Sequence, residues 1–403
     1  MVKSGASYLQ AGTTAVVVVA IASLLPRLTW AQGSTGPVVI GETTQIQSKI
    51  LKESRSLLIS KPPGYDSGTD RYPVLYLLDG ETHFQYTSAM ANFLAVDDRV
   101  PEMLVVGIDS EDSQHRTHDL TPPSTDETDN RFSPGNGGAD VFLSFMADEL
   151  VPFIDKTYRT RPYRLLVGHS FGGLFAIYAL VKKPHLFNAY VAADPSLYWN
   201  KGAVVAEAER FFSTTNQLQA DLYLTVSGDA SGPPPDIVAA LAKKSPAGFR
   251  CHYEQMNDED HVSVPLPSIY RGLETIFEDW NLPHPLSLYD RGGIAAIHNR
   301  FRNAGRRFGY PERDVPPFTI SMLVAELMEA GRLEEASKVL LHDPVAYPPP
   351  WNQLDALARN YEKRGDAVNA IRYYRMSLEQ NPQNGFAKKK LLEKGITLPT
   401  PKP

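Results

Sequence analysis

The segment Gly168-His169-Ser170-Phe171-Gly172 places a serine at the centre of a G-x-S-x-G pattern. Apolar residues from Tyr163 to Val167 predict a short buried strand before it, and Gly173 to Lys182 predict a helix after it. A sharp turn between strand and helix holds such a serine in a strained conformation with its hydroxyl exposed. The pattern therefore favours a nucleophilic serine, with an ordinary glycine-rich turn as the alternative.

Apolar strands alternate with helical segments along residues 36–285. This alternation predicts an α/β fold, a mostly parallel central sheet with helices on both faces. Ligands of such sheets bind beyond the carboxyl ends of the strands, where Ser170, Gly80 and the later polar loops belong. The predicted elements include strands at 73–78, 103–108, 189–193, 221–226 and 249–253 and a helix at 139–158.

Charge and cysteine content exclude several classes of function. The formal net charge of -6 offers no basic surface for nucleic acid, so no nucleic-acid partner is expected. A single cysteine, Cys251, excludes an intrachain disulfide and any multi-cysteine metal site, and is expected to be a buried structural thiol. We expect neither a metal nor an organic cofactor.

Residues 1–31 have the order of a secretory signal peptide. Lys3 supplies a positive charge, an eleven-residue apolar run follows from Ala15 to Leu25, and Ala31 is a small residue before Gln32. The run is too short for a comfortable membrane span. We therefore expect export to a bacterial periplasm or secretion, with no stable membrane span after cleavage. An uncleaved anchor and a misassigned start are the alternatives.

The C-terminal part repeats itself at an interval of 34 residues. The pattern predicts two tetratricopeptide-like repeats over residues 318–395, after a connecting helix and linker over 286–317. An irregular pair of helical hairpins is the alternative. Two units are too few for a free-standing solenoid, so we expect them to dock on the catalytic domain, bind a protein partner or self-associate. The matching positions are Leu323, Leu327, Gly331, Ala336 and Leu340 with Leu357, Tyr361, Gly365, Ala370 and Tyr374.

A serine nucleophile needs a histidine base, which an acid holds in one tautomer. In hydrolases with a strand–turn–helix serine, the chain order is serine, acid, histidine. His261 lies in a polar loop after the last predicted strand, from which it can reach Ser170. The other histidines after Ser170 lie before every plausible acid, within a strand, in the linker or in the repeats. An exposed loop histidine is the alternative reading of His261.

Three residues are candidates for the acid. Asp229 follows the penultimate strand and is favoured, Asp236 lies a few residues further on, and Asp194 directly follows the strand at 189–193. Asp229 could instead belong to a plain turn, with Asp258 or Asp260 merely tuning His261.

Backbone N–H groups are expected to bind the oxyanion of an acyl-transfer reaction. One is that of Phe171, next to the serine, and the second comes from Gly80 or Glu81 after the strand at 73–78. Asp79-Gly80 could also be only a turn. We expect the substrate pocket to include His169, Tyr198 and Trp199, although aromatic residues near a strand end are often plain core.

Together these segments resemble the esterase-D-like, or enterochelin-esterase-like, serine hydrolases of the α/β-hydrolase superfamily. The resemblance implies Ser170 as nucleophile, His261 as base and carboxylic ester hydrolysis through an acyl-enzyme. Related sequences often carry Ser-Pro-Ser where this chain has Asp194-Pro195-Ser196, and some resemble Ser–His dyads without a fixed acid. The resemblance runs from about residue 41 to 280 and is carried by residues 62–66, 72–80, 116–122, 168–173 and 260–265.

The sequence thus predicts a serine carboxylic ester hydrolase acting on small or medium esters. Short acyl esters, siderophore lactones and aryl esters are the candidate substrates. Two alternatives remain at this stage: a catalytically idle hydrolase fold that presents the repeats to a protein partner, and an acyltransferase or peptidase using the same Ser–His pair.

Overall fold

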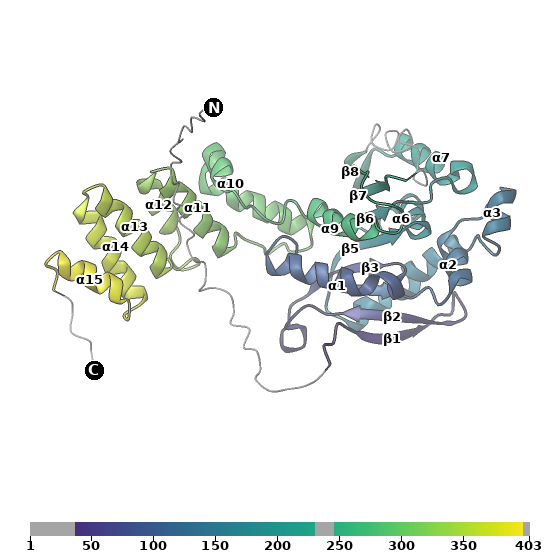
Figure 1. Ribbon diagram of the computed structural model, residues 1–403, viewed down its shortest axis with the longest axis horizontal. Helices are drawn as coiled ribbons and strands as arrows, with labels where there is room; N and C mark the ends of the chain where they lie inside the picture. Colours follow the sequence, from purple (N-terminus) through teal and green to yellow (C-terminus); the bar gives the residue numbers. More distant parts are fainter. Residues whose placement is uncertain (1–36, 230–245, 398–403) are drawn as a thin grey trace, which may run out of the picture. The chain divides into compact units, whose positions relative to one another are not determined.

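The computed structural model describes residues 37–229 and 246–397. Eight strands form one sheet in the order β1-β2-β4-β3-β5-β6-β7-β8 (Figure 1). β1 pairs antiparallel with β2, and β2 pairs antiparallel with β4. All other neighbouring strands are parallel, which confirms the predicted α/β class. The strands are β1 (Glu42–Gln47), β2 (Ser54–Ser60), β3 (Tyr72–Leu77), β4 (Leu104–Ile108), β5 (Thr160–His169), β6 (Ala189–Ala193), β7 (Gln217–Ser227) and β8 (Ala247–Met256).

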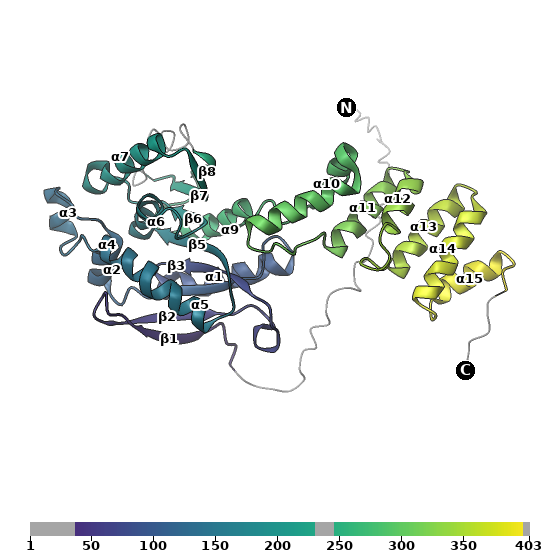
Figure 2. The same cartoon turned by 180° about the vertical axis from the view of Figure 1, so that it is seen from behind.

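Alternate side chains of each central strand enter two different cores. Leu75 and Leu77 of β3 pack beneath α1 (Gly80–Val96) and α9 (Pro265–Ile276). Val74 and Tyr76 pack on the opposite face with the helices that Figure 2 shows from behind. Because both faces are covered, the central strands β3, β4 and β6 are buried along their whole length. The second group comprises α4 (Ala139–Phe145), α5 (Val151–Thr157), α6 (Phe171–Lys182) and α7 (Trp199–Thr214).

The helix predicted over residues 139–158 is continuous but changes its winding. A π-helical turn, η2 (Met146–Leu150), joins α4 to α5. Pro152 lies in the first turn of α5. Proline has no N–H to donate and its ring crowds the preceding turn, which favours a local departure from α-helical winding.

Two short helices lie beyond the carboxyl end of β4. These are α2 (Ser113–Leu120) and α3 (Glu127–Phe132). A buried ion pair ties α2 to the sheet: Arg55 of β2 donates to Asp119 over 2.8 Å. A 3-10 turn, η1 (Tyr65–Ser67), follows β2.

The C-terminal helices form a core of their own. They begin with α10 (Leu286–Arg307), which bends at Gly292 and Gly293. The first helices of the two pairs that follow begin 34 residues apart, as do the second ones. Gly331 and Gly365 adopt left-handed conformations at the two turns. Two helix–turn–helix units are therefore present, and their tetratricopeptide-like character stays a prediction. The helices are α11 (Pro317–Glu329), α12 (Leu333–Leu340), α13 (Trp351–Lys363), α14 (Ala367–Gln380) and α15 (Gly385–Glu393).

Two expectations concern parts of the chain outside the described residues. These are the signal peptide at 1–31 and the alternative acid Asp236. Within residues 37–229 and 246–397, no helix has the length and apolar character needed to cross a bilayer.

Candidate active site

Ser170 occupies a strained turn between β5 and α6. Its backbone has φ 60° and ψ -115°, a region that costs free energy for any residue with a Cβ. The turn is tight enough that a Cβ on Gly168 would lie 2.2 Å from the carbonyl oxygen of Gly172. The Ser170 N–H donates to the carbonyl of Ala193 at the end of β6, over 3.0 Å. The predicted strand–turn–helix geometry is therefore present and raises the hydroxyl at the carboxyl edge of the sheet.

The imidazole of His261 lies between a hydroxyl and a carboxylate. Its Nε2 is 3.1 Å from Ser170 Oγ, and its Nδ1 is 2.6 Å from Oδ2 of Asp194. The loop that carries His261 connects β8 to α9. The structure thus brings Ser170 and His261 together and places Asp194, rather than the favoured Asp229, against the imidazole.

The physical reason for this difference is strand order. Asp194 directly follows β6, which pairs with β5, whereas Asp229 follows β7, one strand further from the serine. The Asp229 carboxylate instead lies beneath the histidine loop. Its Oδ2 accepts the backbone N–H of His261 over 3.4 Å, and its Oδ1 lies 2.5 Å from the Ser227 hydroxyl oxygen.

Hydrogen bonds hold Asp194 ionised in a buried position. Its carboxylate accepts the backbone N–H and the hydroxyl of Ser227, over 3.1 and 2.7 Å. Burial alone would raise the pKa of Asp194, but the bonds from His261 and Ser227 outweigh it and lower that pKa. The hydrogen bond to Asp194 in turn raises the pKa of His261, which burial partly opposes.

The expected oxyanion donors lie at the starts of two helices. Phe171 begins α6 and Gly80 begins α1, so neither N–H has a carbonyl one turn earlier in its own helix. A Cβ on Gly80 would lie 2.8 Å from the backbone of Gly107, so this glycine lets the helix start approach β4. The Glu81 carboxylate accepts the N–H of Ser110 over 3.1 Å and fixes the same loop.

Arg116 of α2 joins the two segments that carry these donors. Its Nε and one terminal nitrogen donate to the two oxygens of Asp79, over 2.7 and 2.8 Å. The same terminal nitrogen donates to the carbonyl of His169 over 3.3 Å. Asp79, with φ 53°, immediately precedes Gly80. The guanidinium therefore contacts the β3–α1 loop and the strand end before Ser170 at the same time.

Comparison with known proteins agrees with this geometry. Residues 48–231 match the family described as "Putative esterase". The chain is 30% identical over 259 residues to ferri-bacillibactin esterase BesA of Bacillus subtilis, covering 58% of this chain and 88% of BesA. The chain belongs to the enterochelin-esterase-like family of serine hydrolases. This esterase is also 29% identical over 255 residues to the siderophore triacetylfusarinine C esterase of Aspergillus fumigatus, covering 53% and 84% of the two chains.

Solved structures share the fold of this esterase. An IroE-like serine hydrolase from Shewanella oneidensis superposes with a TM-score of 0.59 at 24% identity, covering 84% of this chain and 99% of that one. Siderophore hydrolase EstA from Aspergillus nidulans gives 0.53 at 25% identity, covering 62% and 99%. The family and its named members establish carboxylic ester hydrolysis as the activity of this protein.

The three expected pocket residues have different surroundings. The His169 ring lies 4.6 Å from that of His261, and burial lowers the His169 pKa to about 4, so the ring is neutral. Tyr198 is exposed at the surface. Trp199 is only 1% exposed and packs edge-on against Phe171, while its indole N–H donates to the carbonyl of Pro122. Trp199 therefore supports the wall behind Phe171 and offers no face to a substrate.

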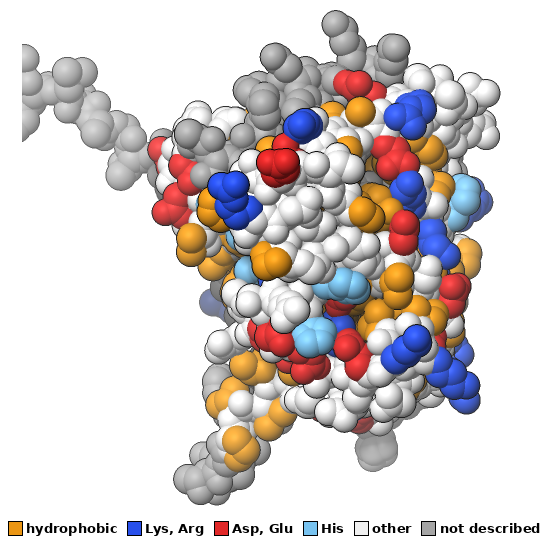
Figure 3. Space-filling view, turned by 90° about the vertical axis from the view of Figure 1, so that its right-hand side faces the viewer, with side chains coloured by type: hydrophobic (Ala, Val, Ile, Leu, Met, Phe, Trp, Pro, Cys, Tyr) orange, Lys and Arg blue, Asp and Glu red, His pale blue; other side chains and the backbone are white. Residues whose placement is uncertain are grey.

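A cavity of about 430 Å³ opens beside the histidine loop of the esterase. It lies between the first turns of α1, with His83 and Tyr86, and the segment Val262–Pro267. The Tyr86 hydroxyl and His83 Nδ1 are 2.5 Å apart, and burial lowers the pKa of His83. Figure 3 views this end of the hydrolase domain, where histidine side chains lie near acidic and hydrophobic ones.

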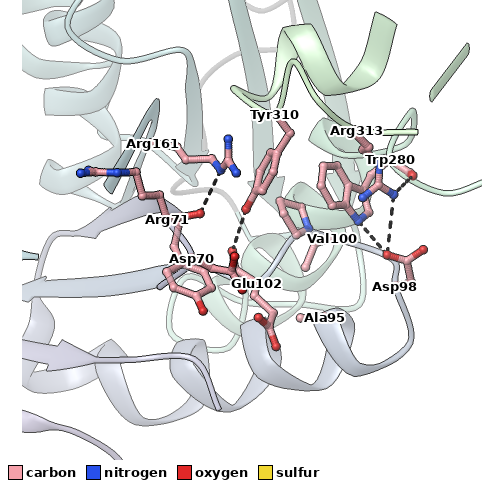
Figure 4. Close-up of a pocket in the computed structure, with 12 residues that line it drawn as sticks. Asp70, Arg71, Ala95, Asp98, Val100, Glu102, Arg161, Trp280, Tyr310 and Arg313 are labelled. Atoms are coloured by element: carbon pink, nitrogen blue, oxygen red, sulfur yellow. Dashed lines mark hydrogen bonds and ion pairs between the residues drawn. The ribbon is translucent and has the colours of Figure 1, made fainter. Parts of the chain in front are cut away.

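A second pocket, of about 320 Å³, lies at the opposite edge of the sheet (Figure 4). It is lined by residues at the starts of β3 and β5 and by Trp280, Tyr310 and Arg313. Two of its three arginines lie over aromatic rings: Arg161 is 3.8 Å from the Tyr310 ring centre, and Arg313 is 3.2 Å from that of Trp280. It contains none of the expected site residues.

Sequence reasoning missed several polar contacts of this site. Ser196, Ser227 and Asp79 hold the catalytic groups or their loops through hydrogen bonds. Ser227 is the last residue of β7, and Asp79 and Ser196 follow β3 and β6 within three residues. This placement is the signal that could have found them, because carboxyl ends of parallel strands meet at one edge. Among the described residues no group of three or more His, Cys, Asp or Glu side chains is arranged to hold a metal ion.

Proposed function

We propose that this esterase cleaves its substrate in two steps through an acyl-enzyme on Ser170. His261 Nε2 takes the hydroxyl proton while Oγ bonds to the ester carbonyl carbon, and the carbonyl electron pair moves onto oxygen. The tetrahedral intermediate collapses, and the proton on Nε2 passes to the departing alkoxide. Water then enters, His261 takes one of its protons, and a second collapse releases the acid and restores the Ser170 hydroxyl.

One observation carries this proposal. Ser170 Oγ lies 3.1 Å from His261 Nε2 while Nδ1 of the same ring lies 2.6 Å from Asp194. The carboxylate keeps the proton on Nδ1, so that Nε2 presents a lone pair to the serine. Asp194 is accordingly proposed as the orienting acid. An idle hydrolase fold would have no use for this arrangement at a strained serine.

The developing oxyanion is proposed to bind the N–H groups of Phe171 and Gly80. Both are first residues of helices, and the positive end of a helix dipole favours negative charge nearby. Contact between the segments supports the pairing: a Cβ built on Gly172 would lie 3.5 Å from Oδ2 of Asp79.

The substrate class is proposed from the named relatives. The Aspergillus fumigatus enzyme is named a siderophore esterase and BesA a ferri-bacillibactin esterase, and the matches cover 84% and 88% of their own lengths. We therefore propose that this enzyme hydrolyses the ester or lactone bonds of a siderophore-type substrate. Simple aryl and short aliphatic esters are the comparison substrates that test this choice.

Active-site labelling tests the chemistry. A fluorophosphonate probe should label the native protein and fail to label Ser170→Ala, and His261→Ala should lower the labelling rate by at least a hundredfold. His284→Ala removes an exposed histidine outside the site and should label at the native rate. Labelling that survives in Ser170→Ala would refute the proposed nucleophile.

A substrate panel tests the specificity. The purified protein is assayed with a macrolactone siderophore, an aryl ester and a short aliphatic ester, with amine and alcohol acceptors added in parallel. The proposal expects the highest kcat/KM for the lactone and the free acid as product. Acyl transfer to an added acceptor in preference to water would instead favour a transferase.

A further inference from the structure

A second serine hydroxyl lies beside the nucleophile. Ser196 Oγ is 3.3 Å from Ser170 Oγ, and the Ser196 side chain is almost fully buried, with 3% of the residue exposed. The Ser196 N–H donates to the carbonyl of Ser170 over 3.1 Å, which fixes the residue against the turn. Ser196 follows Asp194 by two residues, so the segment after β6 supplies both the acid and this hydroxyl.

The proton count gives the direction of the hydrogen bond between the two serines. Asp194 accepts at Nδ1 of His261, so Nδ1 carries the proton and Nε2 of the neutral ring is an acceptor. The hydroxyl of Ser170 therefore donates its single proton to Nε2. Since that proton is used, Ser196 must be the donor to Ser170 Oγ.

We propose that Ser196 is a further catalytic residue, which donates a hydrogen bond to Ser170 Oγ throughout the reaction; this rests on the proposed function. When His261 takes the proton, negative charge develops on Oγ before the bond to carbon is complete, and the Ser196 hydroxyl stabilises it. When the acyl-enzyme breaks down, Oγ is the leaving group and gains negative charge again. The donor acts in both steps and also fixes the direction of the attacking lone pair.

The alternative is that the Ser196 hydroxyl has a purely structural role. Buried hydroxyls generally need a hydrogen-bond partner, and Ser170 could serve only to satisfy Ser196. In that case removal of the Ser196 hydroxyl would affect folding and leave the reactivity of Oγ unchanged. The two roles are separated by measuring the reactivity of Oγ directly, without dependence on ester binding.

The test is the variant Ser196→Ala, measured by steady-state ester hydrolysis and by the rate constant of fluorophosphonate inactivation. Loss of one neutral hydrogen bond predicts that both kcat and the inactivation rate constant fall by about tenfold, while KM stays within twofold. Ser88→Ala is the matched control, because Ser88 is a buried serine of α1 whose hydroxyl makes no hydrogen bond. It should retain native values of both quantities.

A second variant keeps the test decisive if Ser196→Ala fails to fold. Ser196→Cys retains the size of the side chain with a weaker donor, and we expect at least a threefold loss in both rates. Native inactivation rates in a folded Ser196→Ala or Ser196→Cys protein would overturn the inference, as would a lower kcat with an unchanged inactivation rate. Ser170→Ala is assayed alongside: activity retained there refutes the proposed function itself, whereas an inactive Ser170→Ala with a native Ser196→Ala refutes only the role of Ser196.

Discussion

Both ring nitrogens of His261 are engaged, and this restricts which acid can matter. Asp194 is buried and holds Nδ1, while Asp229 accepts the backbone N–H of the same residue. Asp194→Asn should therefore lower kcat by about 10³–10⁴-fold, because the amide no longer imposes the productive tautomer. Asp229→Asn is the matched comparison and should lose less than tenfold in steady-state kcat. A larger loss in Asp229→Asn than in Asp194→Asn would identify Asp229 as the acid that orients His261.

The pH dependence follows from the same contact. The bond to Asp194 raises the pKa of His261 above its ordinary value of 6.5, and a general base must be neutral to act. The acid limb of the kcat/KM profile should therefore lie above pH 6.5, with activity lost as the pH falls through the raised pKa. In Asp194→Asn the limb should move to lower pH while the plateau drops. If the acid limb of the Asp194→Asn profile lies at the same pH as in the native enzyme, the limb reflects the titration of a group other than His261.

Two members of the catalytic group are predictable from local sequence patterns, and the third is not. The pentapeptide and the loop after the last strand pointed to Ser170 and His261, which the structure brings within hydrogen-bond distance. The acid was harder because three aspartates follow strands and the choice depends on which strand neighbours β5. Pairing of β6 with both β5 and β7 is a long-range property that local patterns do not contain.

At the scale of elements, α2 acts through Arg116. The two hydrogen bonds of its guanidinium to Asp79 and the one to the His169 carbonyl connect the loop before α1 to the strand before α6. Arg116→Met should lower kcat/KM by about a hundredfold, since misplacing one oxyanion donor has an effect of that size. Arg131→Met, at an exposed position on α3, should leave steady-state kcat/KM within twofold of native. Native activity in Arg116→Met would show that the loop before α1 keeps its position without the hydrogen bonds from Arg116.

Elements whose pattern is local were predicted well, and those that depend on packing were not. The apolar strands and the turn at Ser170 follow from short patterns, and the helix at 139–158 was found except for its π-helical turn. The bend in α10 was not predicted, although it falls at the consecutive glycines Gly292 and Gly293. Gly293 adopts φ 63° there, a conformation that interrupts helical winding and that glycine readily adopts.

At the scale of the molecule, α10 belongs to two hydrophobic cores. Phe308, the residue after its end, packs among Tyr163, Phe277 and Trp280 of the hydrolase domain. Phe301, two turns earlier, packs with the C-terminal helices. Arg307 donates to both oxygens of the buried Asp221 of β7 over 2.6 Å. The predicted boundary at residue 285 therefore cuts off side chains that complete the hydrolase core.

Two phenylalanine truncations, one within α10 and one at the residue after its end, separate the two cores. Phe308→Ala should cost about 3–5 kcal/mol of hydrolase-domain stability, because it opens a cavity in a fully buried aromatic cluster. Esterase activity should then be lost on heating at a lower temperature than in the native protein.

Phe301→Ala should lower the temperature at which helical circular dichroism is lost while changing the heat-inactivation midpoint of the activity much less. Phe318→Ala, at a half-exposed position on α11, is the control for both. Equal shifts of the activity midpoint in Phe301→Ala and Phe308→Ala would mean that the hydrolase domain and the C-terminal helices unfold as one unit.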